Sequence, residues 1–295
     1  MKMGIFALIG ASVLLGVIPT ANKYLLLSGM TSSQIVFYTY LMVALTAACL
    51  AKVRGESFHI RKSQFFKLFL LGAAGMGGTG YLLNQSYLLI PVGLATMLHF
   101  LYPTVVSMVM IGVYRERMTK GKMAAILASV AGMFFIADLS GGMKLAGVFF
   151  ALCSSGTYAY YIIANDKGEI NELPILIKLC YSAAGASIFC CFLCRGDLAI
   201  PSRISVYLAL FGICGLGFLS AFYLLTTGIS SVGALMASFF NMLEPVVSLV
   251  VSTLMYQDNL QLKTGLGCML VLLSVLFIAA DGISEKRIAQ NKQYV

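Results

Sequence analysis

The sequence predicts an all-α integral membrane protein with about ten transmembrane helices, arranged as two inverted five-helix repeats. Three observations lead to this fold class: the composition, the lengths of the uncharged runs, and an internal repeat. The chain has 295 residues, of which 60% are hydrophobic and 11% charged. Soluble domains average roughly 25% charged residues. Such an excess of apolar residues indicates that the lipid bilayer surrounds most of this chain.

Uncharged runs set the number and order of the helices. One bilayer crossing needs about 20 apolar residues. The runs from Leu68 to Tyr114 and from Ile204 to Leu243 must each hold two crossings, with breaks near 90–93 and 230–233. The first apolar run is too long for a cleaved signal peptide, so we expect it to remain as a helix. In chain order the predicted helices span 4–27, 33–51, 66–88, 92–114, 122–138, 145–164, 173–194, 204–227, 233–255 and 264–280.

An internal repeat divides the chain into two halves. The phrase LYPTVVSMVMIGVYRERM begins at Leu101, and LEPVVSLVVSTLMYQDNL begins 142 positions later, at Leu243. The same offset aligns the third to fifth predicted helices with the eighth to tenth, whereas the first two match the sixth and seventh only loosely. Because five is an odd number, the second copy enters the membrane from the opposite side. The predicted division is a first repeat at 1–140, a second at 141–285 and a tail at 286–295.

The positive charges support opposite orientations of the two copies. The segment from Arg115 to Lys122 carries four basic residues, whereas its counterpart from Gln257 to Thr264 carries only Lys263. Cytoplasmic loops of membrane proteins are enriched in Lys and Arg. We therefore expect a multi-pass protein of the plasma or inner membrane with both termini in the cytoplasm. On this interpretation the net charge of +9 reflects topology, and no nucleic-acid partner is expected.

Several motifs give the chain a family resemblance. The residues that carry it are Pro103, the Arg115-Glu116-Arg117-Met118-Thr119 loop, Gly132, Leu243-Glu244-Pro245, and the Tyr256-Gln257-Asp258-Asn259-Leu260 loop. Together with the repeat, they resemble the EamA type of the drug/metabolite transporter superfamily over nearly the whole chain. The resemblance implies five plus five inverted helices, export of small metabolites, and a central cavity lined by the first, third, fourth, sixth, eighth and ninth helices. The chain departs from the family at Leu15-Gly16, where Trp-Gly is usual, and at Asp258, where Glu is usual.

Glu244 is the leading candidate for the functional site. It lies near the middle of the predicted ninth helix, where a charged group costs roughly 2.5–3.5 kcal/mol on insertion scales. We expect it to be protonated, paired or facing a wet cavity, where it could exchange protons or bind a substrate amine. The alternative is a structural, protonated carboxyl bonded to carbonyls freed by Pro245. Its counterpart in the first repeat, Tyr102, is expected to face the same cavity.

Other polar and aromatic residues in the predicted helices are further candidates. His99 and Asn241 each lie one turn before Tyr102 and Glu244, so each pair shares a helix face. Lys23 could bind a substrate carboxylate or extend to the outer interface, and Lys178 is expected to extend to the cytoplasmic interface. The remaining candidate contacts, for which ordinary packing is the alternative, are Tyr81, Asn84, Tyr158 and Tyr223. The prolines inside predicted helices, expected to cause kinks that serve either rocking or packing, are Pro19, Pro103 and Pro245.

These features predict a secondary transporter that exports amino acids or related small metabolites by alternating access. Proton exchange at Glu244 and passive transport both remain open, as does a multidrug or lipid-type carrier of the same superfamily. An intramembrane enzyme is disfavoured because there are only two His and no clustered carboxylates. No metal or cofactor is expected, since the glycine-rich stretch Gly72–Gly80 lacks the lysine of a phosphate loop. We assign that stretch to close helix packing. The sequence does not define the oligomeric state.

Overall fold

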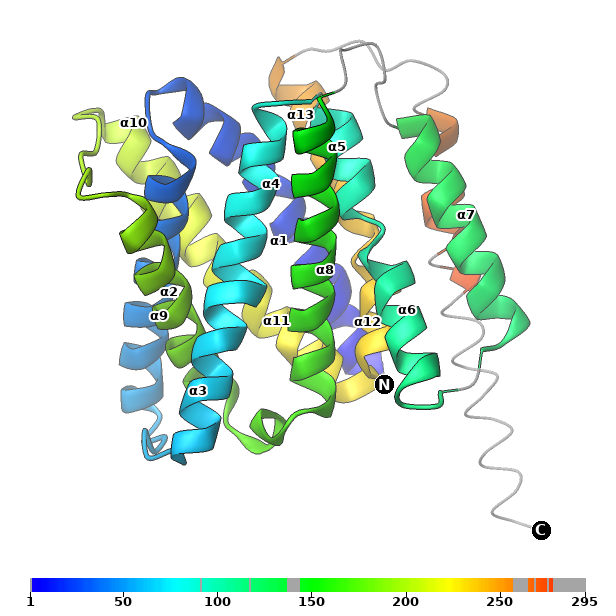
Figure 1. Ribbon diagram of the computed structural model, residues 1–295, viewed down its shortest axis with the longest axis horizontal. Helices are drawn as coiled ribbons and strands as arrows, with labels where there is room; N and C mark the ends of the chain where they lie inside the picture. The colour runs from blue at the N-terminus through cyan, green and yellow to red at the C-terminus, as the bar shows by residue number, and fades with distance from the viewer. Residues whose placement is uncertain are drawn as a thin grey trace.

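The structure is a single bundle of helices of different lengths (Figure 1). We call the face at which α1 begins the N-terminal face; it is the lower one in Figure 1. No β-strand occurs among the residues that the computed structural model describes. These are residues 2–90, 92–116, 118–136, 144–256, 265–267, 269–274 and 276–277.

The first repeat begins with two long helices joined by a tight turn. Gly29 in this turn has a φ of 96°, a conformation that glycine adopts without steric cost. Thr31 then caps the next helix, because its hydroxyl accepts from the Gln34 backbone N–H (3.3 Å) while the Gln34 side chain accepts from the Thr31 N–H (2.8 Å). The elements of this repeat are α1 (Lys2–Leu27), α2 (Ser32–Val53), α3 (Lys62–Leu70), the π-helix η1 (Leu71–Gly78), α4 (Thr79–Tyr87), α5 (Val92–His99), α6 (Tyr102–Gly112) and α7 (Lys120–Ile136).

The second repeat has the same elements in the same order. They are α8 (Leu145–Lys167), α9 (Ile175–Leu193), α10 (Ile204–Tyr207), the π-helix η3 (Leu208–Leu216), α11 (Gly217–Val232), α12 (Ala234–Phe240) and α13 (Leu243–Tyr256), with the short 3-10 helix η2 (Glu169–Glu172) between α8 and α9. A further apolar helical segment, Gly265–Ser274, occupies the position of α7. Within the described residues, six stretches are long and apolar enough to cross a membrane alone: Met3–Leu27, Ser32–Val53, Lys62–Tyr87, Leu145–Lys167, Ile175–Leu193 and Ile204–Val232. With the shorter helices they confirm the predicted all-α membrane fold.

The offset of 142 residues holds for the whole architecture, including the two helices whose sequences match only loosely. Shifted by 142, α1 and α2 would span 144–169 and 174–195, and the observed helices span 145–167 and 175–193. The third and eighth crossings both begin in α-helix, at Lys62 and Ile204, and both continue through a π-helical segment. The positions of these helices are thus repeated although their apolar side chains have diverged.

The fourth and ninth crossings differ from the prediction of one continuous helix each. Each is two helices, separated at residues 100–101 in the first repeat and at 241–242 in the second. Pro103 and Pro245 lie in the first turn of the second helix of each pair, where the missing N–H costs no helical hydrogen bond. Pro19, in contrast, lies inside the continuous helix α1.

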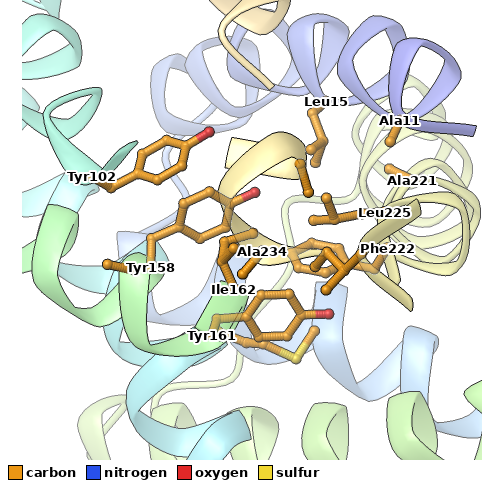
Figure 2. Packing of buried hydrophobic residues seen from close by; sticks show 14 of the residues in the cluster. Ala11, Leu15, Tyr102, Tyr158, Tyr161, Ile162, Ala221, Phe222, Leu225 and Ala234 are labelled. Carbon is orange, nitrogen blue, oxygen red and sulfur yellow. The ribbon is translucent and has the colours of Figure 1, made fainter. Parts of the chain in front are cut away.

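Helices of the two repeats pack against each other throughout the bundle. α1 packs against α11 and α13, and α2 against α9. At the contact between η1 and α9, a Cβ added to Gly72 would lie 2.6 Å from the carbonyl carbon of Ser182. The contact bears out the packing role predicted for the glycine-rich stretch. Figure 2 shows how α1, through Ala11 and Leu15, faces Ala221 and Leu225 in the buried core.

Candidate functional site

A cavity of about 100 Å³ lies between the two repeats, which is room for several water molecules. It runs from the helix breaks in the middle of the bundle toward the face opposite the N-terminal face, where α1 ends and α2 begins. The lining comes from α1, α2, η1, α4, α5, α8, α11 and α13. Its residues include Leu15, Ile18, Pro19, Asn22, Ile35, Val36, Thr39, Tyr40, Met76, Thr79, Asn84, Tyr87, His99, Tyr158, Phe218, Phe222 and Glu244.

Glu244 lies in the cavity wall, in the first turn of α13. The crossing is interrupted just before this residue, and α13 begins at Leu243, so Glu244 is the second residue of the new helix. A carboxylate is favoured at a helix N-terminus by the helix dipole. Within the described part of the chain its carboxyl group makes no hydrogen bond and no ion pair, and the side chain is only partly buried. The carboxyl group is therefore available to water or to a ligand in the cavity.

His99 and Tyr158 form the wall beside Glu244. His99 Nδ1 lies 3.0 Å from Ser154 Oγ, and the His99 and Tyr158 rings are 5.4 Å apart. Both side chains are buried and line the cavity. The sequence prediction of a polar lining at this height holds for His99, whose partner Ser154 comes from α8 and was not predicted.

Tyr102 and Asn241 lie behind the wall instead of lining the cavity, as was predicted for them. Both are fully buried at 0% exposure. Asn241 Nδ2 donates to Tyr158 Oη (3.1 Å), and Tyr102 Oη donates to the Ser238 carbonyl (3.2 Å). Figure 2 shows the Tyr102 and Tyr158 rings side by side, 4.7 Å apart and nearly perpendicular. Tyr102 thus joins α6 of the first repeat to α12 of the second, whereas Asn241 holds Tyr158 in place within the second repeat.

The other predicted contacts are divided between the cavity and the periphery. Asn84 lines the cavity, and so does Pro19, whereas Tyr81 is not among the lining residues. Tyr223 lies away from it, where its hydroxyl accepts a hydrogen bond from Arg54 Nη1 (3.3 Å). Lys23 belongs to α1, but its side chain is outside the described part of the structure.

The α2 helix contributes lining residues that neither the sequence nor the resemblance indicated. Thr39 carries a buried hydroxyl that has no hydrogen-bond partner in the described part of the chain. Tyr40 forms an aromatic wall with Phe218 and Phe222, at ring distances of 5.6 and 6.4 Å. The one available signal was Thr39 itself, a polar residue in an apolar run. The wall can surround an apolar group, while Glu244 and the Thr39 hydroxyl can bind a polar one.

Charged contacts lie at the N-terminal face, far from the cavity. Lys67 Nζ is 2.8 Å from Glu169 Oε2 and holds the pKa of that carboxyl below its usual range. Lys167 Nζ lies 3.3 Å from Glu116 Oε1 and 5.7 Å from the centre of the Tyr114 ring. These contacts join the loops that follow the sixth and fourth crossings to neighbouring helices.

Comparison with known proteins shows two copies of one family unit in this chain. The EamA-like transporter family matches residues 2–137 and again residues 145–280. The chain is 26% identical over 301 residues to the uncharacterized inner membrane transporter YicL of Salmonella typhimurium, covering 98% of this chain and 99% of that protein. It is 27% identical over 218 residues to an uncharacterized transporter of Archaeoglobus fulgidus, covering 72% of this chain and 76% of that one.

A solved structure has the same fold. It is described only as "Crystal structure of protein", shares 17% sequence identity, and superposes with a TM-score of 0.77 over 94% of this chain and 98% of that one. The family matches coincide with the two structural repeats around the cavity. The chain therefore belongs to the EamA-like transporter family, and it is a membrane transporter with two EamA repeats.

Proposed function

We propose that this transporter is a secondary carrier that exports amino acids or related small metabolites by alternating access around the cavity at Glu244. The observation that carries the proposal is the position of this carboxyl group. It has no partner among the described residues, it faces the cavity, and it lies where the twin helices α12–α13 and α5–α6 are interrupted. Interrupted helices at the interface of inverted repeats form the substrate site in many secondary transporters.

The proposed orientation places the N-terminal face in the cytoplasm. This face carries most of the loop Lys and Arg residues, in agreement with the charge bias of membrane proteins. The cavity of this structure then extends toward the outside. Since the repeats are similar and oppositely oriented, an exchange of their conformations closes this cavity and opens an equivalent one to the cytoplasm.

Glu244 is proposed to bind a substrate amine and a proton alternately. A carboxylate in a cavity with mostly apolar walls binds a cation more strongly than it would in bulk water, because the effective dielectric constant there is lower. If a proton and an ammonium group compete for the same carboxyl, each transport cycle exchanges one for the other. This competition would couple export to the proton gradient without a second ion site.

Transport into proteoliposomes tests the proposal. Purified protein is reconstituted with a panel of labelled amino acids and amines, with and without a pH gradient. Glu244→Gln is expected to abolish stimulation by the pH gradient and to reduce amine transport by about tenfold, as the loss of one hydrogen bond to a charged group predicts. Glu172→Gln is the matched control, since Glu172 is exposed in η2 away from the cavity, and it should behave like the parent. Normal gradient-driven transport by Glu244→Gln would refute the role of this carboxyl group.

A multidrug-type carrier is the second candidate, and the aromatic wall favours it. The rings of Phe218 and Phe222 are stacked 5.4 Å apart beside Tyr40. Aromatic faces attract organic cations. The same liposomes therefore also receive tetraphenylphosphonium, whose transport in preference to amino acids would favour this function over metabolite export. A lipid-type carrier would instead move labelled phospholipid between leaflets in the same preparation.

A further inference from the structure

The described cavity lies on one side of the bundle, although the two repeats are related by a constant offset. Each lining residue has a counterpart 142 positions away. Two pairs, Met76 with Phe218 and Gly80 with Phe222, line the cavity together, whereas the counterparts late in α8 and α11 and early in α9 lie toward the N-terminal face. Several counterparts of lining residues are at most 2% exposed, among them these six: Tyr161, Ile177, Lys178, Leu225, Thr226 and Asn241. Their partners in the open half are, in the same order, Pro19, Ile35, Val36, Leu83, Asn84 and His99. The two halves of the molecule thus hold the same positions in an open and a closed form.

The closed half is held by specific contacts. Tyr161 Oη lies 3.3 Å from Thr226 Oγ1, and the Tyr161 ring meets the Phe222 ring edge-on at 5.2 Å. Figure 2 shows Tyr161 stacked below Tyr158, with Leu225 and Phe222 beside it. Tyr161 and Thr226 come from different helices of the second repeat, α8 and α11. Separation of these helices would be needed to open the closed half.

Lys178 is the one charged residue among these six counterparts. Its side chain was expected to extend to the membrane interface, but the structure buries it to 2% exposure, so that expectation was wrong. Its ammonium group makes no ion pair or hydrogen bond within the described part of the chain. The residue one turn later on the same face, Ser182, packs tightly against Gly72 of η1. Burial of an unpaired charge is unfavourable, so Lys178 does not stabilise this conformation.

We propose that Lys178 lies in the wall of a second cavity, which opens at the N-terminal face in the alternate state, and that its ammonium group there attracts the carboxylate of the substrate. The inference rests on the proposed alternating access. In the open cavity, water solvates the ammonium group and a carboxylate can form a charge-assisted hydrogen bond with it. Val36 occupies the equivalent position of the present cavity, whose described lining includes Glu244 and no Lys or Arg. A carboxylate is thus attracted on the cytoplasmic side and released on the other, which is the direction of export.

Charged thiol reagents test both parts of the proposal. Thr226→Cys places a thiol in the proposed cavity, and Ile177→Cys does so independently if the first variant does not fold. Inside-out membrane vesicles are treated with a sulfonate-bearing or a trimethylammonium-bearing methanethiosulfonate, and the reaction rates of the parent chain with its eight native Cys are subtracted. The new thiol is expected to react from the cytoplasmic side, with the anionic reagent favoured.

A second measurement tests the charge of Lys178. Lys178→Met is expected to lower the ratio of anionic to cationic reaction rates about fivefold at the new thiol, and Lys178→Arg should keep it. Asn84→Cys, at the position equivalent to Thr226 in the present cavity, is the control whose ratio Lys178→Met should leave unchanged. The proposal is overturned if neither thiol reacts from the cytoplasmic side in a variant that still transports, or if Lys178→Met leaves the ratio unaltered. If the parent chain itself transported none of the tested compounds in proteoliposomes, the proposed function would be refuted instead.

Discussion

Replacement of Gly72 by Ala should destabilise the protein by separating the third crossing from α9. A Cβ at this position would lie 2.6 Å from the carbonyl carbon of Ser182 and 2.9 Å from its Cα. Both are backbone atoms, so no side-chain rotation can relieve the clash, and the helices must move apart. Overpacking of a close interface costs roughly 1–3 kcal/mol. This loss outweighs the gain of about 1 kcal/mol that Ala brings over Gly in a helix.

The measurement is the apparent melting temperature of the purified protein in detergent. Gly72→Ala is expected to lower it by several degrees. Gly217→Ala is the matched control, because Gly217 begins α11 in the second repeat and a Cβ there would meet nothing within 4 Å. If Gly72→Ala were as stable as the parent and as Gly217→Ala, the close approach of η1 to α9 would not contribute to the fold.

The remaining predictions concern a buried amide and a surface ion pair. Asn241→Leu keeps the side-chain size but removes the donor to Tyr158, so we expect a loss of about 0.6–1.7 kcal/mol of stability, measured by unfolding in mixed micelles. If Asn241→Leu still folds but its transport rate falls strongly, the position of Tyr158 matters for the cavity. Glu169→Gln should change the melting temperature little at neutral pH, because its contact with Lys67 is exposed. Lys67 lowers the pKa of Glu169, so the small stabilisation is present at neutral pH and is lost as the pH falls through that pKa. The melting temperatures of parent and variant should therefore converge in acid. A difference that widens in acid would contradict the assignment.

The candidate site could be predicted from the sequence only in part. A carboxyl group in an apolar run is unusual enough to single out Glu244, and helical spacing correctly brought His99 to the same cavity. Periodicity could not show that α5–α6 and α12–α13 are interrupted, and the interruption turns Tyr102 and Asn241 away from the cavity. The contribution of Thr39 and Tyr40 also depends on the packing of α2 against the other repeat, which no local pattern records.

The sequence by itself determined the membrane fold, because a bilayer crossing demands a long apolar run and the Lys and Arg residues of the loops differ between the copies. It also determined the repeat, since an offset of 142 is visible in the letters. Only the tertiary structure decided which half of the bundle is open and which positions are buried in the other half. The reason is physical: the two repeats are similar enough to adopt either form, so the choice between them depends on contacts such as Tyr161 with Thr226 that join helices distant in the chain.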